Sequence, residues 1–239
     1  TVAVVGESGS GKTTAALALA RLTPPPPACS LSGVAKWEDG TDLLTCPDSV
    51  LRQARGGKLA YIFQEPSTSL NPVFSVGFQI REALELHQPG LVDFDAEMAR
   101  LLQLVGIRDP EKRIRDYPHQ LSGGMQQRAM IAMALACKPR LLVADEPTTA
   151  LDVTVQKQIL DLLTSLAESR QMATILISHD LGAVAGRTDR VQVMYAGRVV
   201  ERSATGEVFE APRHPYTEGL LASIPRLSDP PHTTLRAIV

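Results

Sequence analysis

The clearest chemical signal in the chain comes from eight residues near its start, Gly6-Glu7-Ser8-Gly9-Ser10-Gly11-Lys12-Thr13. They fit the pattern G-x-x-x-x-G-K-[ST], in which glycines let successive backbone N–H groups point inward at phosphate oxygens. Lys12 can then reach the β- and γ-phosphates, and the Thr13 hydroxyl can hold Mg²⁺. A plain glycine turn is the alternative interpretation. The residues predicted to contact a nucleoside triphosphate are Gly6, Ser8, Gly9, Ser10, Gly11, Lys12, Thr13 and Thr14.

Further polar side chains follow three predicted buried strands. Gln64 follows strand 58–63, Asp145 and Glu146 follow strand 141–144, and His179 comes just after strand 174–177. Because the carboxyl ends of parallel strands meet at one edge of a sheet, we expect these groups to gather beside the glycine-rich loop.

These four side chains suit Mg²⁺-dependent phosphoryl transfer. Asp145 would hold Mg²⁺, directly or through water, and Glu146 would orient the attacking water or accept its proton. His179 would reach the γ-phosphate, and Gln64 the metal and the water. A solvated turn is the alternative for the two carboxylates. A structural, hydrogen-bonded role is the alternative for His179.

Strands that alternate with helices must position these groups. Strand 1–5 precedes the loop, helix 14–22 follows it, and a hairpin is expected at 191–195 and 198–201. Short strands are plausible in 30–44, and a helical turn in 49–55. Further helices are expected at 75–87, 95–105, 122–137 and 155–167. The predicted fold is therefore α/β, with a mostly parallel sheet, flanking helices and an inserted α-helical subdomain.

One helix in this insertion carries a methionine-rich stripe, which we interpret as core rather than as a binding surface. The stripe consists of Met125, Ala129, Ala132, Met133 and Ala136.

The bulk composition narrows the possible functions. A chain of 239 residues with 44% hydrophobic residues suits one large domain, or a core with one inserted subdomain. The net charge of −2 gives no broad basic field for nucleic acid. No apolar run approaches the length of a membrane span, and no signal peptide is present. Three scattered cysteines indicate a reduced, cytosolic chain.

Two longer motifs resemble those of the ATP-binding-cassette (ABC) ATPases, which belong to the P-loop NTPases. LSGGMQQR at 121–128 resembles their signature, and LLVADEPTTALD at 141–152 resembles their second Walker motif with the loop after it. Gln64 and His179 match the family's glutamine and histidine switch positions.

This resemblance implies an ATPase that uses ATP and Mg²⁺, with Thr13, Gln64 and Asp145 at the metal and Glu146, His179 and Gln64 as catalytic residues. Two cassettes would close head to tail over two ATP molecules. Ser122, Gly123 and Gly124 of one would face the γ-phosphate held by the other, and Asp152 joins the nucleotide-binding set. A plain helix cap is the alternative for Ser122.

Three stretches resemble the oligopeptide/dipeptide-permease branch of that family: 62–80, 117–136 and 214–227. The branch imports peptides and, in some members, nickel or other small solutes. The resemblance implies a peripheral subunit at the cytoplasmic face of the inner membrane, with no nucleic-acid partner. Its partners would be a second cassette, the same or related, two transmembrane permease subunits and an extracytoplasmic solute-binding protein. The branch marker His-Pro-Tyr-Thr at 214–217 has no chemistry that the sequence explains; a structured turn beginning a tail helix is its plain interpretation.

The resemblance covers nearly the whole chain and gives a single ABC ATPase domain over 1–239. Segments 1–65 and 139–205 would form the nucleotide-binding core, 66–138 the helical signature subdomain and 206–239 the C-terminal tail. The chain starts inside a core strand, so we interpret it as truncated after the family's adenine-stacking segment. It also stops before the cysteine-containing extension of the branch, so no iron–sulfur site is claimed.

Two other functions are alternatives to peptide import. One is an ABC ATPase not linked to transport, of the nucleic-acid repair or translation type. Such proteins carry long coiled-coil insertions, zinc modules or a second cassette, and the sequence shows none of these. The other is a non-hydrolysing regulatory subunit, which the presence of Lys12, Gln64, Asp145, Glu146 and His179 argues against.

Overall fold

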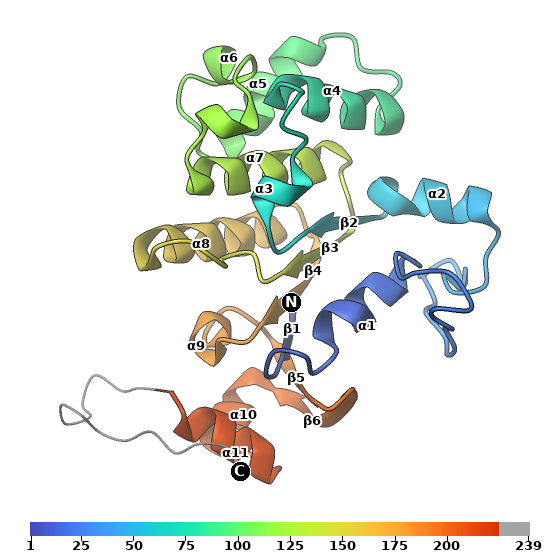
Figure 1. The fold of residues 1–239 in the computed structure, drawn as a ribbon, viewed down its shortest axis with the longest axis vertical. Helices are drawn as coiled ribbons and strands as arrows, with labels where there is room; N and C mark the ends of the chain where they lie inside the picture. Colours follow the sequence, from blue (N-terminus) through green and yellow to red (C-terminus); the bar gives the residue numbers. More distant parts are fainter. Residues whose placement is uncertain (225–239) are drawn as a thin grey trace. The chain divides into compact units, whose positions relative to one another are not determined.

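The computed structural model (Figure 1) describes residues 1–224, and residues 225–239 lie outside the described part. The chain forms two compact units: unit 1 comprises residues 1–16 and 175 onward, and unit 2 comprises residues 17–174. The described strands form a mostly parallel six-stranded sheet, and helices flank it, which confirms the predicted α/β class. The expected tail at 206–239 and the motif stretch at 214–227 are described only as far as residue 224.

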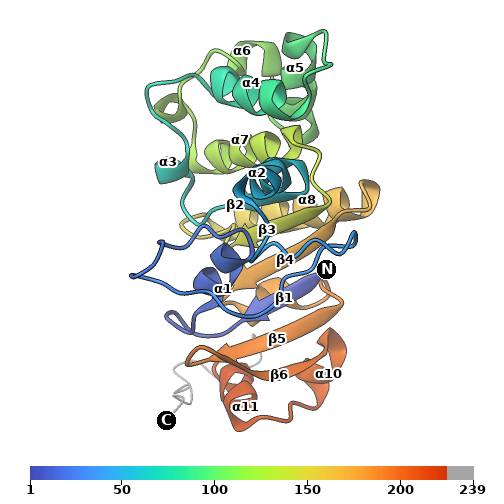
Figure 2. The ribbon, with the colours of Figure 1, turned by 90° about the vertical axis from the view of Figure 1, so that its right-hand side faces the viewer.

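The sheet of unit 1 is built on β1 (Val2–Val5), the apolar run before the glycine-rich loop. Two strands flank β1 and run parallel to it: β4 (Ala173–Ser178), which enters unit 1 at residue 175, and β5 (Arg190–Tyr195). β6 (Arg198–Ala204) returns antiparallel to β5, so the predicted hairpin is confirmed. Figure 2 shows β1, β5 and β6 side by side.

Further helices of unit 1 come from the C-terminal part of the sequence. They are α9 (Leu181–Val184), α10 (Thr205–Glu210) and α11 (Pro215–Ala222). α10 packs on β5 and β6 through Val208, which is fully buried. The first turn of α1 (Lys12–Leu19) also belongs to unit 1, and the helix passes into unit 2 after residue 16.

Two parallel strands, β2 (Leu59–Ile62) and β3 (Leu141–Asp145), form the sheet portion of unit 2. β3 is buried over most of its length, as expected of a continuous apolar run covered on both faces. α2 (Asp48–Gly57) packs against β2. α8 (Val153–Ser169) buries one face, and its buried side chains include Ile159, Leu163 and Leu166.

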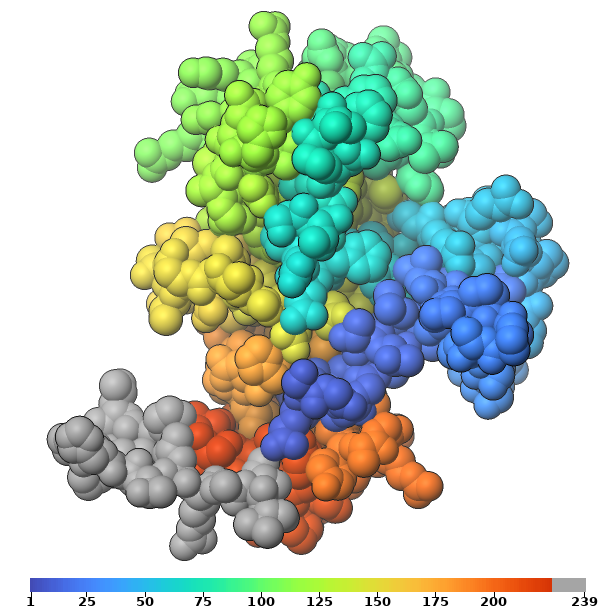
Figure 3. All heavy atoms as spheres, in the orientation of Figure 1, coloured from blue at the N-terminus to red at the C-terminus, as the bar shows by residue number. Residues whose placement is uncertain are grey.

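A run of helices lies between β2 and β3 in the sequence. It consists of α3 (Pro66–Ser69), α4 (Val76–His87), α5 (Phe94–Leu104), α6 (Pro110–Arg113), the 3-10 helix η1 (Pro118–Gln120) and α7 (Gly123–Ala136). α4, α5 and α7 pack on one another and bury Ile80, Leu101 and Ile131 almost completely. Figure 3 shows their side chains, from teal to green, as one continuous mass. The predicted helices at 75–87, 95–105 and 122–137 are therefore confirmed.

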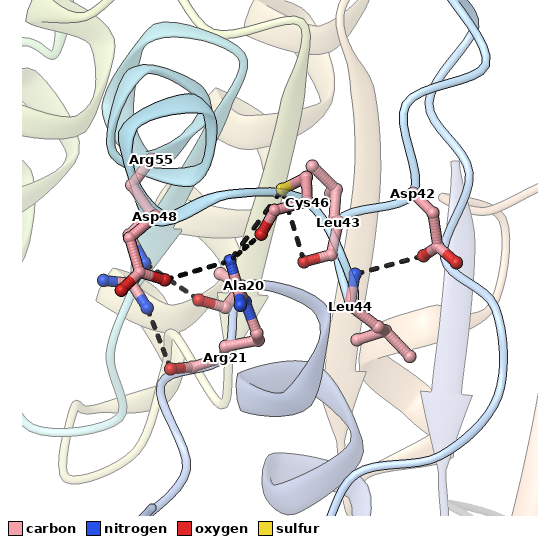
Figure 4. Close-up of polar contacts among 8 residues, drawn as sticks. All are labelled: Ala20, Arg21, Asp42, Leu43, Leu44, Cys46, Asp48 and Arg55. Carbon is pink, nitrogen blue, oxygen red and sulfur yellow. Dashed lines mark hydrogen bonds and ion pairs between the residues drawn. The ribbon is translucent and has the colours of Figure 1, made fainter.

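The segment after α1 is fixed to α2 by two arginines (Figure 4). The Arg55 guanidinium donates to the carbonyl oxygens of Ala20 and Arg21, at 2.8 Å each. Arg21 donates in turn to the Cys46 carbonyl oxygen at 2.8 Å and lies 3.4 Å from the Asp48 carboxylate. Carbonyl groups that the end of a helix leaves without partners are thus satisfied by side chains.

The structure differs from the sequence prediction in three places. α1 ends at Leu19 rather than at 22, and Arg21 follows in a left-handed conformation with φ 50°. The strands expected within 30–44 are reduced to one isolated bridge between Lys36 and Asp42. The short helices α3, α6, η1, α9 and α10 were not predicted, because one or two turns carry too little apolar periodicity for the sequence to reveal.

Candidate nucleotide site

In unit 1 the glycine-rich loop joins β1 to α1, as the motif requires. Gly6, Gly9 and Gly11 have φ values of 152°, 80° and 96°, which side-chain-bearing residues rarely adopt. A Cβ at Gly6 would lie 2.2 Å from the Met194 carbonyl oxygen, whereas one at Gly9 would meet nothing within 4 Å. The loop is therefore packed tightly where it leaves the strand and open at its middle.

Lys12 lies across the inside of this loop and is only 5% exposed. Its ammonium group donates to the carbonyl oxygens of Gly6 at 2.8 Å and Glu7 at 2.9 Å. The Ser10 hydroxyl is buried and has no hydrogen-bond partner among the described residues. The first turn of a helix also presents N–H groups without partners in the helix. These donors suit a phosphate, so the loop residues fit the predicted ligand.

The hairpin between β5 and β6 supports the other side of the loop. The Gly197 N–H donates to the Ser10 carbonyl oxygen at 3.0 Å, and a Cβ at Gly11 would lie 3.6 Å from the Gly197 Cα. Ala196 and Gly197 both have positive φ, as a tight hairpin turn requires. This support is tertiary, and the sequence motif alone does not reveal it.

The structure brings His179 to the same sheet edge as the glycine-rich loop. Val5 pairs with Ser178 in the parallel register of β1 and β4, so Gly6 and His179 leave adjacent strands at one level. His179 is exposed. Within unit 1, the expectation that strand ends gather therefore holds for the loop and the histidine.

In unit 2 the same geometry joins Gln64 to Glu146. Ile62 pairs with Ala144, and two residues further along the Gln64 amide donates to Glu146 Oε2 at 3.2 Å. The Thr149 hydroxyl donates to the same oxygen at 3.1 Å, a contact that the sequence did not suggest. Glu146 has φ 44°, and such strained backbone in a non-glycine residue occurs often at active sites. The neighbouring Asp145 is only 5% exposed.

The signature segment lies at the start of α7, also in unit 2. Ser122 is the N-cap, and its hydroxyl accepts from the Met125 N–H at 3.4 Å. A Cβ at Gly124 would lie 2.8 Å from a methyl group of Val155 on α8, so glycine allows the two helix starts to approach closely. Asp152 caps α8 by accepting from the Val155 N–H at 2.9 Å. The plain interpretation of Ser122 as a helix cap is thus what the structure shows, although its hydroxyl proton is still available to donate.

The predicted Mg²⁺ ion would have few protein ligands in this structure. The described residues contain no group of three or more His, Cys, Asp or Glu side chains that could hold one. Mg²⁺ typically binds through only one or two carboxylates together with phosphate oxygens, so the Thr13 hydroxyl of unit 1 and, separately, the Asp145 carboxylate of unit 2 are each a ligand of the kind that it uses.

Comparisons with known proteins identify this set of motifs. Residues 1–149 match the family described as ABC transporter, and residues 200–238 match the one described as Oligopeptide/dipeptide transporter, C-terminal region. The dipeptide transport ATP-binding protein DppD of Haemophilus influenzae is 52% identical over 95% of this chain and 68% of its own length. The oligopeptide transport ATP-binding protein OppD of Bacillus subtilis is 50% identical over the whole chain and 66% of its own length.

Solved structures show the same fold. A dimeric, post-hydrolysis structure of the ATP-binding cassette MJ0796 bound to ADP and Pi matches with a TM-score of 0.74 and 26% identity, over 85% of this chain and 84% of that one. The cassette cbiO1 of Clostridium perfringens, part of an ABC transporter complex, matches with a TM-score of 0.73 and 25% identity, over 88% and 79%. The chain belongs to the ABC transporter ATPase family and carries the C-terminal region of its oligopeptide/dipeptide branch.

Proposed function

We propose that the chain binds and hydrolyses Mg²⁺-ATP and thereby powers the import of oligopeptides, dipeptides or a related small solute. The observation that carries the proposal is the glycine-rich loop, with Lys12 held inside it by two carbonyl oxygens. The chain spans about two thirds of the length of the two curated relatives described above, so the activity of the whole protein is inferred from a part.

The predicted residues of the loop would divide the work of binding among them. The backbone N–H groups of Gly6, Ser8, Gly9 and residues 11–14, together with the hydroxyl groups of Ser8 and Ser10, would donate to phosphate oxygens. Lys12 would exchange its carbonyl partners for the β- and γ-phosphates, and Thr13 would ligate Mg²⁺ through its hydroxyl. The bound magnesium nucleotide supplies the γ-phosphoryl group and an ion that neutralises charge on its oxygens.

Residues of the strand ends would carry the chemistry. Asp145 would hold the metal, directly or through water, and Gln64 would contact the metal and the attacking water. Glu146 would take the proton of that water at a carboxylate oxygen that Gln64 and Thr149 already orient. His179 would donate to the γ-phosphate.

A second cassette, the same chain or a related one, would complete each site. Ser122, Gly123 and Gly124 of one cassette would donate to the γ-phosphate bound by the other, and Asp152 would lie with the nucleotide-binding groups. Two solved structures of the cassette MJ0796, which resemble this chain, are described as dimeric, and this supports the arrangement. In light scattering, Glu146→Gln with Mg²⁺-ATP should run as a dimer, and adding Ser122→Arg should return it to a monomer. If Glu146→Gln stays monomeric with Mg²⁺-ATP, both alone and when mixed with a related cassette, the proposal that two cassettes complete each site is overturned.

An exposed apolar patch supports docking to membrane subunits. Val73, Phe74 and Phe78 are 70%, 42% and 50% exposed, and the two phenylalanine rings stack with centroids 4.6 Å apart. Exposed aromatic patches of this kind often mark interaction sites. No helix among residues 1–224 is long and apolar enough to cross a bilayer, so the proposed transporter would need separate permease subunits, fed by an extracytoplasmic binding protein. The chain would then work at the cytoplasmic face of the inner membrane.

Peptide uptake in cells tests the transport part of the proposal. Deleting the gene from its source should abolish uptake of labelled di- and oligopeptides. Wild-type protein should restore uptake, and Glu146→Gln should not. Normal peptide uptake in the deletion strain, in the absence of a second importer, would overturn the assignment to peptides.

A further inference from the structure

The His-Pro-Tyr segment at 214–216 has a physical role that its sequence did not reveal. His214 is the N-cap of α11, and its Nδ1 atom accepts from the Tyr216 N–H at 3.1 Å. Pro215 occupies the first position of that helix, where its missing N–H costs nothing and its φ is preset. Histidine and proline therefore start the helix at a fixed place and direction.

Glu201 on β6 anchors the start of this helix. Its two carboxylate oxygens accept from the backbone N–H groups of Arg213 at 2.9 Å and His214 at 3.0 Å. Burial opposes ionisation of Glu201, but these hydrogen bonds and the contact with Thr217 outweigh it and leave the pKa of the carboxyl below its ordinary value. The segment is thus tied to the sheet of unit 1 immediately before Tyr216.

Tyr216 extends from this anchored helix to the glycine-rich loop. Its hydroxyl oxygen accepts a hydrogen bond from the Glu7 N–H at 3.0 Å, across 209 residues of sequence. The tyrosine is only 6% exposed, and its ring packs against Tyr195 with centroids 4.5 Å apart. The carbonyl oxygen of Glu7 accepts from Lys12 at 2.9 Å. Both backbone polar groups of Glu7 are therefore held, one by the lysine of the loop and the other by α11.

We propose that Tyr216 is a positioning residue for the phosphate-binding loop, so that the C-terminal segment sets nucleotide affinity. The inference rests on the proposed function, because it assumes that the loop binds nucleotide. A hydrogen bond at Glu7 fixes the peptide that follows Gly6 before any ligand arrives. A loop ordered in advance loses less conformational freedom on binding, and this raises affinity without changing the chemistry.

The test compares two tyrosine-to-phenylalanine variants by equilibrium titration with Mg²⁺-ATP and Mg²⁺-ADP. Tyr216→Phe removes the acceptor but keeps the ring, and affinity for both nucleotides should fall about 2- to 10-fold, the worth of one hydrogen bond. Tyr195→Phe is the matched control, because its ring belongs to the same pair and its hydroxyl makes no hydrogen bond among the described residues. Its affinity should equal that of the wild type.

Kinetics separate positioning from a merely structural role. In Tyr216→Phe the KM for ATP should rise by the same factor while kcat changes less than about twofold, which is the signature of lost uniform binding. Tyr216→Ala should show the same loss of affinity together with a lower melting temperature. Normal affinity in Tyr216→Phe with reduced affinity in Tyr216→Ala would show that only the ring matters, and would overturn the inference.

Failure of the inference and failure of the proposed function give different results. If wild-type protein binds no nucleotide, the proposed function fails. If wild type binds Mg²⁺-ATP and Tyr216→Phe binds it equally well, the function stands and the role of Tyr216 is refuted.

Discussion

Replacing Glu146 by glutamine should remove a proton acceptor from the site while keeping the size of the side chain and its hydrogen bonds. Glu146 Oε2 accepts from Gln64 at 3.2 Å and from Thr149 at 3.1 Å, and a glutamine carbonyl oxygen can accept both bonds. The side chain is half-buried, so the new NH₂ group can reach water. The cost in stability should therefore be about 1 kcal/mol or less, the difference between charged and neutral acceptors. An amide cannot take a proton, and loss of a general base lowers rates by about 10²–10⁴, or roughly 3–5 kcal/mol in barrier.

Phosphate release from Mg²⁺-ATP at saturating nucleotide measures this effect, with thermal unfolding and ATP titration on the same samples. Glu146→Gln should lose at least about a hundredfold in turnover while its ATP affinity stays near that of the wild type. Glu168→Gln, the same change at an exposed carboxylate on α8, is the matched control and should be silent. Turnover of Glu146→Gln close to wild type would show that Glu146 is not the general base, because another group would then have to position the water.

Three further predictions follow from packing and burial. Gly6→Ala should weaken Mg²⁺-ATP binding more than about tenfold, because its Cβ would lie 2.2 Å from the Met194 carbonyl oxygen. Gly9→Ala lies in open space, so it should lower the free energy of unfolding by the strain of positive φ, about 1–2 kcal/mol, and should weaken Mg²⁺-ATP binding less than Gly6→Ala does. Equal losses of affinity in the two variants would show that the contact with Met194 does not shape the loop. Phe74→Glu should reduce peptide transport about tenfold or more while basal ATPase activity stays within twofold, because an exposed aromatic anchor is lost from the docking patch. A proportional fall in both activities would show that the patch does not couple ATP hydrolysis to transport. Burial raises the pKa of the Cys137 thiol to about 11, so at pH 8 this thiol should be alkylated roughly tenfold more slowly than free cysteine. The rate of labelling, followed by mass spectrometry, should increase as the pH approaches 11. A rate that does not depend on pH would contradict the raised pKa.

Local sequence was enough to predict the elements that carry the chemistry. β1 and the first four residues of β3 are continuous apolar runs; Gly6 follows β1 and begins the loop, and Asp145 ends β3 and begins the acidic pair. Both signals lie within a few residues of chain, where side-chain type and backbone preference act directly. The same holds for Ser122, which caps α7 where the sequence placed a helix start.

The hydrogen bonds that orient the site could not be predicted from the sequence. The Glu7 N–H pairs with Tyr216 from the opposite end of the chain, and Glu146 pairs with Gln64, 82 residues away. Such partners are chosen by packing, and neither periodicity nor spacing encodes them. Thr149 is closer to Glu146 in sequence, but its contact with Glu146 forms where the backbone of Glu146 is left-handed, a conformation that the sequence did not predict. The resemblance to a known family supplied roles for individual residues that spacing alone left open.

Phosphate release from Mg²⁺-ATP by the wild-type protein is the most direct test of the central claim. Release should saturate with ATP, require Mg²⁺ and rise per molecule as protein concentration increases, because two cassettes complete each site. Folded protein that binds no Mg²⁺-ATP, and that releases no phosphate above a protein-free blank even with candidate partner cassettes present, would contradict it.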